Sequence, residues 1–345
     1  MGKIFNYGVN ISGISQGFYG NWDNMPVNVA PNCAVDITDL HSTRGLILPV
    51  PSVIEYFKRE KIYKFYLRRT FAMGDILMLV PVVRYLRTLG FDTYLRTRSR
   101  YFDILDRFGI RAISLQFGPN DPGIELDKTV EMDHSRPAVQ MLHRINIYLS
   151  AIGFDKFPKK LEWGYDKSRF PSFGQLENFK FKEKDYIVFQ GSGSTKAKSL
   201  SKITIESIIN SLNREGENVV YIGNPIRLNL KYPEMAQVAC VTYNFFKLFP
   251  MLEYAKSALI MDSGPLWLSH FTETPVVVIF GPTNPDARLP YHPLYPEKVK
   301  AVETNKHINC KRCYEAAERC NHEFKCLHIP ADILFNDIYS KLLEI

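Results

Sequence analysis

From Tyr63 onward, the hydrophobic positions alternate between two patterns, one typical of strands and one typical of helices. Together the two patterns predict a parallel sheet covered by helices. Short apolar runs predict strands, and apolar residues three or four positions apart predict helices. In chain order the predicted elements are a strand at 63–70, a helix at 76–90, a strand at 91–99, a helix at 101–109 and a longer helix at 138–153. This alternation is typical of a parallel sheet with helices on its faces. Residues 63–170 are therefore predicted to form one Rossmann-like domain.

The same alternation begins again after a segment at 154–182, whose prolines and lysines predict a crossing between domains. The predicted elements are then a strand and glycine loop at 185–194, a helix at 204–216, a strand at 218–225, a helix at 245–255, a strand at 257–264, a helix at 265–273 and a strand at 274–283. Residues 180–330 are thus predicted to form a second Rossmann-like domain, facing the first across a cleft. Ligands of such sheets bind beyond the carboxyl ends of the strands.

The two ends of the chain have patterns of their own. Residues 1–62 are rich in Gly, Asn, Pro and aromatic side chains, with β-like runs such as 45–54, and predict an irregular β-rich extension. Residues 331–345 predict an amphipathic C-terminal helix, which we expect to pack back across the first domain.

Composition narrows the class of ligand and the compartment. The chain has 43 Lys and Arg against 36 Asp and Glu, a formal charge of +7, which suits an anionic ligand such as a nucleotide, a phosphorylated glycolipid or nucleic acid. No uncharged apolar stretch is long enough to span a membrane. The start of the chain lacks the apolar core of a signal peptide, so we expect a cytoplasmic protein whose cysteines stay reduced.

Two short segments of the second domain are candidates for binding an anion. The corner formed by Asp262, Ser263, Gly264 and Pro265 joins a strand to a helix, where Asp262 or Ser263 can cap the helix and backbone N–H groups can approach an anion. The loop at 190–200 adds two glycines, hydroxyls and two lysines after another strand, without the spacing of a P-loop. A capped turn and a solvated loop are the alternatives without function.

In the first domain, Asp75 follows Gly74 at the predicted start of a helix. An acidic residue in the first turn is favourable by itself. A carboxylate at the carboxyl edge of the sheet could also accept a proton from an acceptor hydroxyl.

These segments together resemble glycosyltransferase family 9, the heptosyltransferases of bacterial surface polysaccharide. The resemblance rests on "MGDILMLVPVVRYLRTLG", "GSGSTKAKSL" and "DSGPLWLSHFTETPVVVIFGPTNP" in this order, and covers roughly residues 63–335. It implies a GT-B fold and an inverting transfer of a heptose or related sugar from a nucleotide-diphosphate sugar, resembling ADP-heptose, without a catalytic metal. An acceptor could be a saccharide, a protein or a modified base in DNA, and an oligomer is possible.

The resemblance also assigns roles to residues. Asp75 matches the general base of the family. The residues expected to bind the donor are Ser192, Ser194, Thr195, Lys198, Gly223, Asp262, Ser263, Gly264, Pro265 and Leu266.

Two positions depart from the family pattern. Trp267 stands where the family usually has a histidine, and it could donate one hydrogen bond, stack on a base or sugar, or fill the core; His270, one turn later, could replace the histidine in part. The acidic residue that holds the donor ribose is also missing, since the next acid after Gly223 is Glu234. A binding or assembly protein that has lost the chemistry is therefore the alternative to an enzyme.

Four cysteines crowd into a short polar segment near the end of the second domain. Cys310, Cys313, Cys320 and Cys326 suit a tetrahedral thiolate site for one structural zinc or iron, with nearby histidines as possible substitutes. Four unligated thiols are the alternative. Cysteine-rich tails also occur in some protein-heptosylating relatives, which this cluster resembles.

Three arginines alternate at the end of the strand predicted at 91–99. With a period of two, Arg96, Arg98 and Arg100 would share one face of the strand and could receive an acidic acceptor. A solvated strand end is the alternative.

Overall fold

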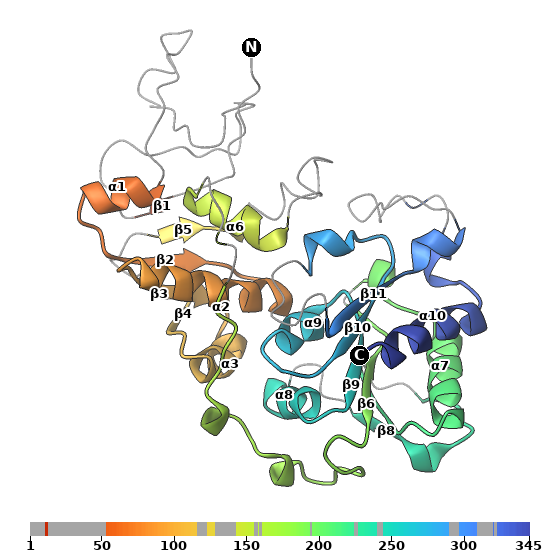
Figure 1. The fold of residues 1–345 in the computed structure, drawn as a ribbon. Helices are drawn as coiled ribbons and strands as arrows, with labels where there is room; N and C mark the ends of the chain where they lie inside the picture. The colour runs from red at the N-terminus through yellow and green to blue at the C-terminus, as the bar shows by residue number, and fades with distance from the viewer. Residues whose placement is uncertain are drawn as a thin grey trace. The chain divides into compact units, whose positions relative to one another are not determined.

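The chain divides into two compact units, Met1–Glu162 and Trp163–Ile345, each built on its own sheet (Figure 1). The computed structural model describes residues 11–12, 53–115, 123–127, 143–154, 158, 161–193, 195–223, 227–239, 244–289, 297–308, 320 and 323–345. Among the helices in these ranges, none is both long and apolar enough to cross a bilayer.

The first unit contains a five-stranded sheet in the order β1-β5-β2-β3-β4. The strands are β1 (Ile11–Ser12), β2 (Lys64–Arg68), β3 (Asp92–Thr97), β4 (Ala112–Ser114) and β5 (Gly123–Glu125). All neighbours pair in parallel except β1, which runs antiparallel to β5. The helices are α1 (Val53–Arg59), α2 (Met73–Thr88), α3 (Phe102–Arg107) and α6 (Arg144–Ile152).

Helix α2 is the central helix of the first unit. Its side chains are buried over most of its length, from Gly74 to Leu86, which explains why the segment carries so few polar positions. It begins at Met73, earlier than the pattern predicts, so Asp75 lies in its first turn. The residue before it, Ala72, has φ 62°, a left-handed backbone that non-glycine residues seldom adopt.

In the first unit, the structure differs from the prediction at the start of helix α6 and at the end of the N-terminal extension. Helix α6 begins at Arg144, after the non-helical His143, and the earlier part of the predicted helix lies outside the described residues. Most of the predicted irregular extension lies outside them too. Its last part, Val53–Arg59, is helical instead of β-like because Ile54 and Phe57 bury a helical stripe.

The second unit contains a six-stranded sheet in the order β11-β10-β9-β6-β7-β8, with every pair parallel. The strands are β6 (Ile187–Gln190), β7 (Val219–Ile222), β8 (Ala236–Ala239), β9 (Ser257–Met261), β10 (Val276–Phe280) and β11 (Val299–Glu303). The helices are α7 (Lys202–Arg214), α8 (Phe245–Glu253), α9 (Gly264–Ser269) and α10 (Ala331–Leu343). Strands β6, β9 and β10 are buried along their full length, as expected for strands covered on both faces.

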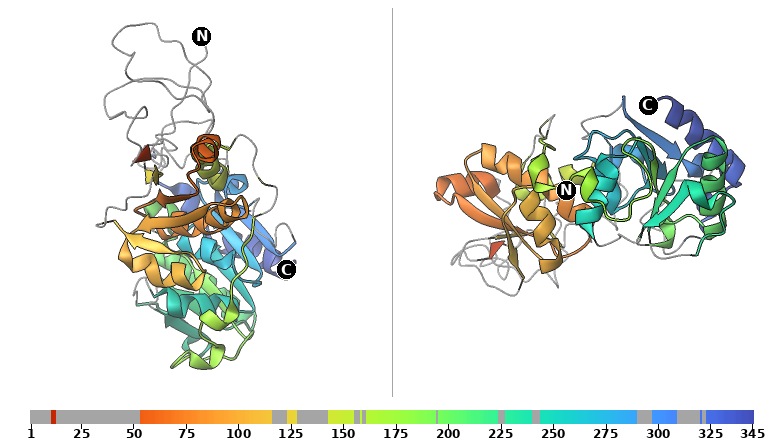
Figure 2. Two further views of the ribbon diagram at one scale, coloured as in Figure 1. Left: turned by 90° about the vertical axis from the view of Figure 1, so that its left-hand side faces the viewer. Right: turned by 90° about the horizontal axis from the view of Figure 1, so that it is seen from below.

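Helix α10 belongs to the second unit, where it lies beside α7 on one face of the sheet (Figures 1 and 2). Leu334, Phe335 and Ile338 of α10 join the same apolar core as Ile208 of α7. The expectation that this helix packs across the first domain was wrong, because its apolar face is covered by α7 and the sheet of its own unit.

If α10 is an integral part of this core, truncating one of its buried side chains should destabilise the second unit. Leu334 is fully buried, so Leu334→Ala should lower the free energy of unfolding by about 2–5 kcal/mol in urea denaturation. The neighbouring Ile333 is 43% exposed, and Ile333→Ala should stay within about 0.5 kcal/mol of the wild type. Equal effects of the two substitutions would contradict this assignment of the helix faces.

Candidate active site

In the second unit, loops that follow three neighbouring strands bring charged side chains together. Asp262 comes directly after β9, Lys198 lies in the loop after β6, and Arg288 lies in the segment after β10. Because these strands are parallel neighbours, their carboxyl ends share one edge of the sheet. The three residues therefore meet at the edge where α/β sheets bind ligands.

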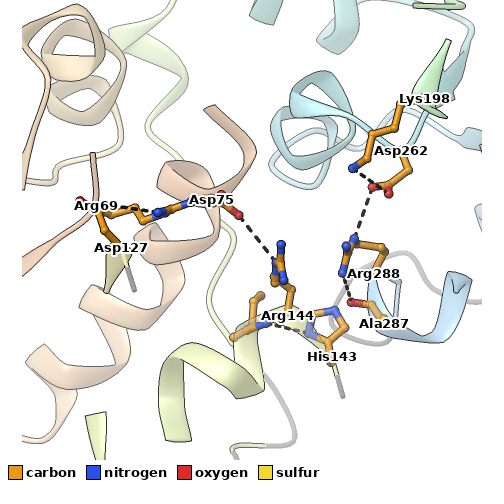
Figure 3. A network of polar contacts seen from close by, with 10 residues as sticks. Arg69, Asp75, Asp127, His143, Arg144, Lys198, Asp262, Ala287 and Arg288 are labelled. Atoms are coloured by element: carbon orange, nitrogen blue, oxygen red, sulfur yellow. Dashed lines mark hydrogen bonds and ion pairs between the residues drawn. The ribbon is translucent and has the colours of Figure 1, made fainter. Parts of the chain in front are cut away.

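Asp262 is the centre of this charged group (Figure 3). Lys198 Nζ lies 3.1 Å from Asp262 Oδ2, and Arg288 Nε lies 3.4 Å from Oδ1. Burial by itself raises the pKa of the Asp262 carboxyl, but Lys198 and Arg288 outweigh it and lower that pKa to about 2. The carboxylate is therefore ionised at neutral pH, and two cations face one anion.

Gln190, the last residue of β6, links the glycine loop to the corner at Asp262. Its side-chain carbonyl accepts hydrogen bonds from Met261 N at 3.2 Å and from Ser263 Oγ at 2.9 Å. Its amide donates to the Ser192 carbonyl. One buried side chain thus fixes both segments predicted to bind the donor.

Close packing explains two glycines of this site. A Cβ on Gly193 would lie 2.7 Å from the Lys198 carbonyl, whose oxygen accepts the Gly193 N–H at 2.8 Å. A Cβ on Gly223 would lie 2.9 Å from Tyr221 Oη and 3.0 Å from Ser192 Oγ. The loop after β6 therefore folds back on itself at Gly193 as closely as only glycine allows, and Ser192 of that loop lies close to Gly223 at the end of β7.

The other residues predicted to bind the donor lie in different surroundings. Thr195 is exposed, and Ser194 lies outside the described residues. Gly264 and Pro265 open helix α9, while Leu266 is fully buried. Neither Asp262 nor Ser263 caps α9 with its side chain, because Asp262 bonds to cations and Ser263 to Gln190.

In the first unit, Asp75 is also a buried carboxylate held by arginines (Figure 3). Arg69 Nη2 donates to Asp75 Oδ2 at 2.6 Å, and Arg144 Nε lies 3.8 Å from Oδ1. Arg69 also donates to Asp127 Oδ1 at 2.9 Å through Nη1. Burial by itself raises the pKa of the Asp75 carboxyl, but the charges of Arg69 and Arg144, together with the hydrogen bond from Arg69, outweigh it. The pKa of Asp75 is therefore held below its usual value.

Residues 125–322, more than half of the chain, match the sequence model of glycosyltransferase family 9 (heptosyltransferase). The chain belongs to this family. It is a glycosyltransferase, as its sequence motifs predict.

Solved structures of family 9 proteins share its fold at low sequence identity. TibC of enterotoxigenic E. coli, described as a dodecameric iron-containing heptosyltransferase in complex with ADP-D-β-D-heptose, aligns with a TM-score of 0.57 and 15% identity over 88% of this chain and 80% of TibC. E. coli ADP-heptose lipopolysaccharide heptosyltransferase II aligns with a TM-score of 0.55 and 14% identity over 81% and 99% of the two chains. A family 9 protein of Veillonella parvula aligns with a TM-score of 0.54 and 12% identity over 82% and 98%.

No curated protein sequence is significantly similar to the chain. The structural likenesses and the two α/β units, each built on a mainly parallel sheet, together confirm the predicted GT-B class.

Trp267, which departs from the family 9 pattern, is a core residue. It is 3% exposed and stacks on Trp163, with ring centroids 6.3 Å apart. Its neighbour His270 is fully buried and bonds through Nδ1 to the Leu266 carbonyl at 2.7 Å. Burial lowers the pKa of His270 to about 4, so this ring is neutral at pH 7. The expectation that His270 replaces a cationic phosphate ligand was wrong for this reason.

The three alternating arginines do not share a strand face, because β3 ends at Thr97. Arg96 Nη2 donates to the Leu115 carbonyl at 2.7 Å. The Arg98 guanidinium lies 4.0 Å from the ring centroid of Phe71, and Arg100 Nη2 donates to Tyr101 Oη at 2.8 Å.

Only part of the cysteine cluster can be placed. Cys310 and Cys313 lie outside the described residues. Cys320 is half-buried, and its Sγ accepts a hydrogen bond from Phe324 N at 3.4 Å. Cys326 is buried in the core of the second unit. Within the described part of the chain, no group of three or more His, Cys, Asp or Glu side chains could hold a metal.

Lys198 is the one described cationic partner of the two carboxylates that the sequence motifs contain. Arg69, Arg144 and Arg288 touch Asp75 or Asp262, yet none stands within the motif that contains its partner. For Gln190, the sequence offers one indication: it is the last residue of a predicted strand, directly before the glycine loop.

The buried neutral His270 predicts a pH dependence of stability. Its folded pKa of about 4 lies below the unfolded value of 6.5, so the unfolded chain binds the proton more readily. Stability should therefore be complete above pH 6.5 and fall as the pH drops toward 4, by roughly 3 kcal/mol in total. Urea denaturation at several pH values should show a flatter slope for His270→Gln, whereas the exposed His328→Gln should keep the wild-type slope. Equal slopes for all three proteins would be inconsistent with a neutral buried ring.

Proposed function

We propose that this family 9 glycosyltransferase moves a heptose or related sugar from a nucleotide-diphosphate donor, resembling ADP-heptose, to an acceptor hydroxyl with inversion. The acceptor oxygen attacks the anomeric carbon as the bond from that carbon to the diphosphate oxygen breaks. Asp75 takes the proton of the acceptor hydroxyl, and the nucleoside diphosphate departs with the bonding electrons. A single displacement of this kind inverts the anomeric centre.

The observation that carries this proposal is the group formed by Lys198, Asp262 and Arg288. Two cations around one carboxylate leave an excess positive charge at the carboxyl edge of the sheet. Negative charge grows on the diphosphate as it departs, and preorganised cations stabilise it without a metal. The complex of TibC with ADP-D-β-D-heptose supports the choice of donor.

Asp75 is proposed as the base because it is a buried ionised carboxylate at the position of the family's base. Its low pKa makes it a weak base, but it is fully ionised at neutral pH and needs no prior deprotonation. The presence of Trp267 in place of the family's histidine is compatible with catalysis. Trp267 is buried and stacks on Trp163, so it serves as a core residue and is not needed as a partner of Asp75 or Asp262.

Donor binding is tested with a panel of nucleotide sugars and the thermal unfolding midpoint. ADP-heptose should stabilise the protein, and Lys198→Ala should weaken that binding by roughly 1.5–3 kcal/mol, as for a charged hydrogen bond to phosphate. Lys196→Ala, an exposed lysine of the same loop, should bind nearly as the wild type does. No stabilisation by any donor would argue for a protein without this activity, and an unaffected Lys198→Ala would move the diphosphate elsewhere.

Asp75→Asn should reduce the rate of sugar transfer by about 10²–10⁴-fold, because the amide cannot accept the proton. Donor affinity in the thermal assay should stay close to that of the wild type. Asp103→Asn, which removes an exposed carboxylate of the same unit, is the matched control and should keep full activity. Near-normal turnover of Asp75→Asn would reduce Asp75 to a residue that only favours the start of helix α2.

We also propose that the cysteine cluster holds one structural zinc or iron. The described thiols fit this role in part: the N–H of Phe324 donates to Cys320 Sγ, an outer hydrogen bond of the kind that orients a metal ligand. The left-handed backbones of Glu323 and Phe324 turn the chain between Cys320 and Cys326. A four-thiolate shell would hold this segment in place and leave no open position for substrate.

The purified protein should then carry about one zinc or iron per chain. Cys320→Ser should lower metal content and the unfolding midpoint together, because metal binding contributes to folding. Cys33→Ser, which leaves all four cysteines of the cluster in place, should not change the metal content. Chelation should not inhibit transfer at once. Elemental analysis decides the question, and a metal-free preparation of full stability would refute the site.

A further inference from the structure

We propose that Arg69 and Asp127 are positioning residues for Asp75: Arg69 holds its Oδ2, and Asp127 keeps Arg69 paired when Asp75 takes a proton. The inference rests on the role of Asp75 proposed above. Arg69 and Asp127 both lie outside the sequence motif that contains Asp75.

The guanidinium of Arg69 is shared between two carboxylates (Figure 3). Nη2 donates to Asp75 Oδ2 at 2.6 Å and Nη1 donates to Asp127 Oδ1 at 2.9 Å. The side chain of Arg69 is 7% exposed, so water competes little for these bonds. A rigid planar fork with one arm on each partner fixes the position of Oδ2 more firmly than a single contact would.

Asp127 is itself fixed by the residue after Arg69. Thr70 N donates to Asp127 Oδ1 at 2.7 Å, and the Thr70 hydroxyl donates to Oδ2. The sheet sets this arrangement, because β2 and β5 are parallel neighbours with Arg68 paired to Glu125. Both strands end at the same edge, so Arg69 and Thr70 meet Asp127 there.

The two oxygens of Asp75 are held unequally. Oδ2 has the short bond to Arg69, whereas Arg144 Nε approaches Oδ1 only to 3.8 Å, beyond hydrogen-bond distance. Oδ1 is therefore the oxygen assigned to the acceptor proton, and Oδ2 remains anchored during the transfer.

Asp127 matters most once the proton has moved. When Asp75 becomes neutral, Arg69 loses one of its two anionic partners while it remains buried, and an unpaired buried cation is strongly unfavourable. The bond from Arg69 Nη1 to Asp127 Oδ1 remains, so Arg69 keeps a carboxylate partner. The protonated state of Asp75 is therefore more accessible with Asp127 present than without it.

This arrangement predicts opposite changes for the two partners. The groups that face Asp75 are Arg69 after β2, Arg144 and Tyr148 on α6, and Asp127 through Arg69. Removing the positive charge of Arg69 should raise the pKa of Asp75, since burial then outweighs the single remaining arginine. Removing the negative charge of Asp127 should lower that pKa further. A purely structural role would not produce shifts of opposite sign.

The test combines a titration with a rate. The carboxyl ¹³C shift of Asp75, identified by its loss in Asp75→Asn, is followed against pH in the full chain. In parallel, ADP release from ADP-heptose with water as acceptor is measured over the same pH range. In Arg69→Gln, Asp75 should titrate at higher pH than in the wild type, and the rate should fall at acidic pH. In Asp127→Asn, Asp75 should titrate at lower pH, and the rate should show no such fall. Arg69→Lys keeps the charge but loses the fork, so its rate should fall by about 10²-fold with little change in titration.

Controls separate this inference from loss of folding and from the proposed function. Arg87→Gln removes another arginine of the first unit, bonded to the Gly109 carbonyl, and should alter neither readout. The double variant Arg69→Gln with Asp127→Asn removes both charges of this ion pair, so no unpaired charge is left behind. The pKa of Asp75 in this variant should lie above that of the wild type. If Asp75→Asn is inactive but Arg69→Gln matches the wild type in the pKa of Asp75 and in rate, the positioning role of Arg69 and Asp127 is refuted. The role of Asp75 as base is then retained. Shifts of the same sign in Arg69→Gln and Asp127→Asn refute it too. If Asp75→Asn releases ADP normally, the base and its positioning pair both fall.

Discussion

A buried carboxylate stays ionised only where cations compensate for the water that it has lost, and this requirement organises both units of the protein. Asp75 has Arg69 and Arg144, and Asp262 has Lys198 and Arg288. Both carboxylates lie at the carboxyl edge of a parallel sheet, because there loops from neighbouring strands converge. The same geometry thus supplies the partners in both units and sets the polar chemistry that each can offer.

The two clusters differ in what their charge can do. Around Asp262 the cations exceed the anions, which suits a ligand that brings negative charge. Around Asp75 the second carboxylate, Asp127, restores the balance, which suits a group that must change its own protonation state. These are the requirements of a leaving group and of a base, and they support the transfer reaction that we propose for this family member.

The sequence predicted long buried strands better than short or partly exposed ones, and it missed the three-residue strand β5 inside the first sheet. Buried strands such as β9 and β10 are continuous apolar runs, and their class could be predicted from pattern alone. The edge strands β8 and β11 were missed, because an edge strand is half exposed and mixes polar with apolar residues. At the site, Asp75 and Asp262 could be predicted because each stands in a local motif. Asp127 and Arg288 could not, since only the strand order brings them near their partners.

Gln190 has a consequence for how a donor would be received. Its single amide bonds to the loop after β6 and to the corner after β9, so these two segments are already joined before any ligand arrives. Binding to segments that are free to move loses conformational entropy as they become ordered. Here the sheet and the Gln190 side chain already order these segments when the protein folds. Donor binding therefore loses less conformational entropy, and more of the interaction energy contributes to affinity.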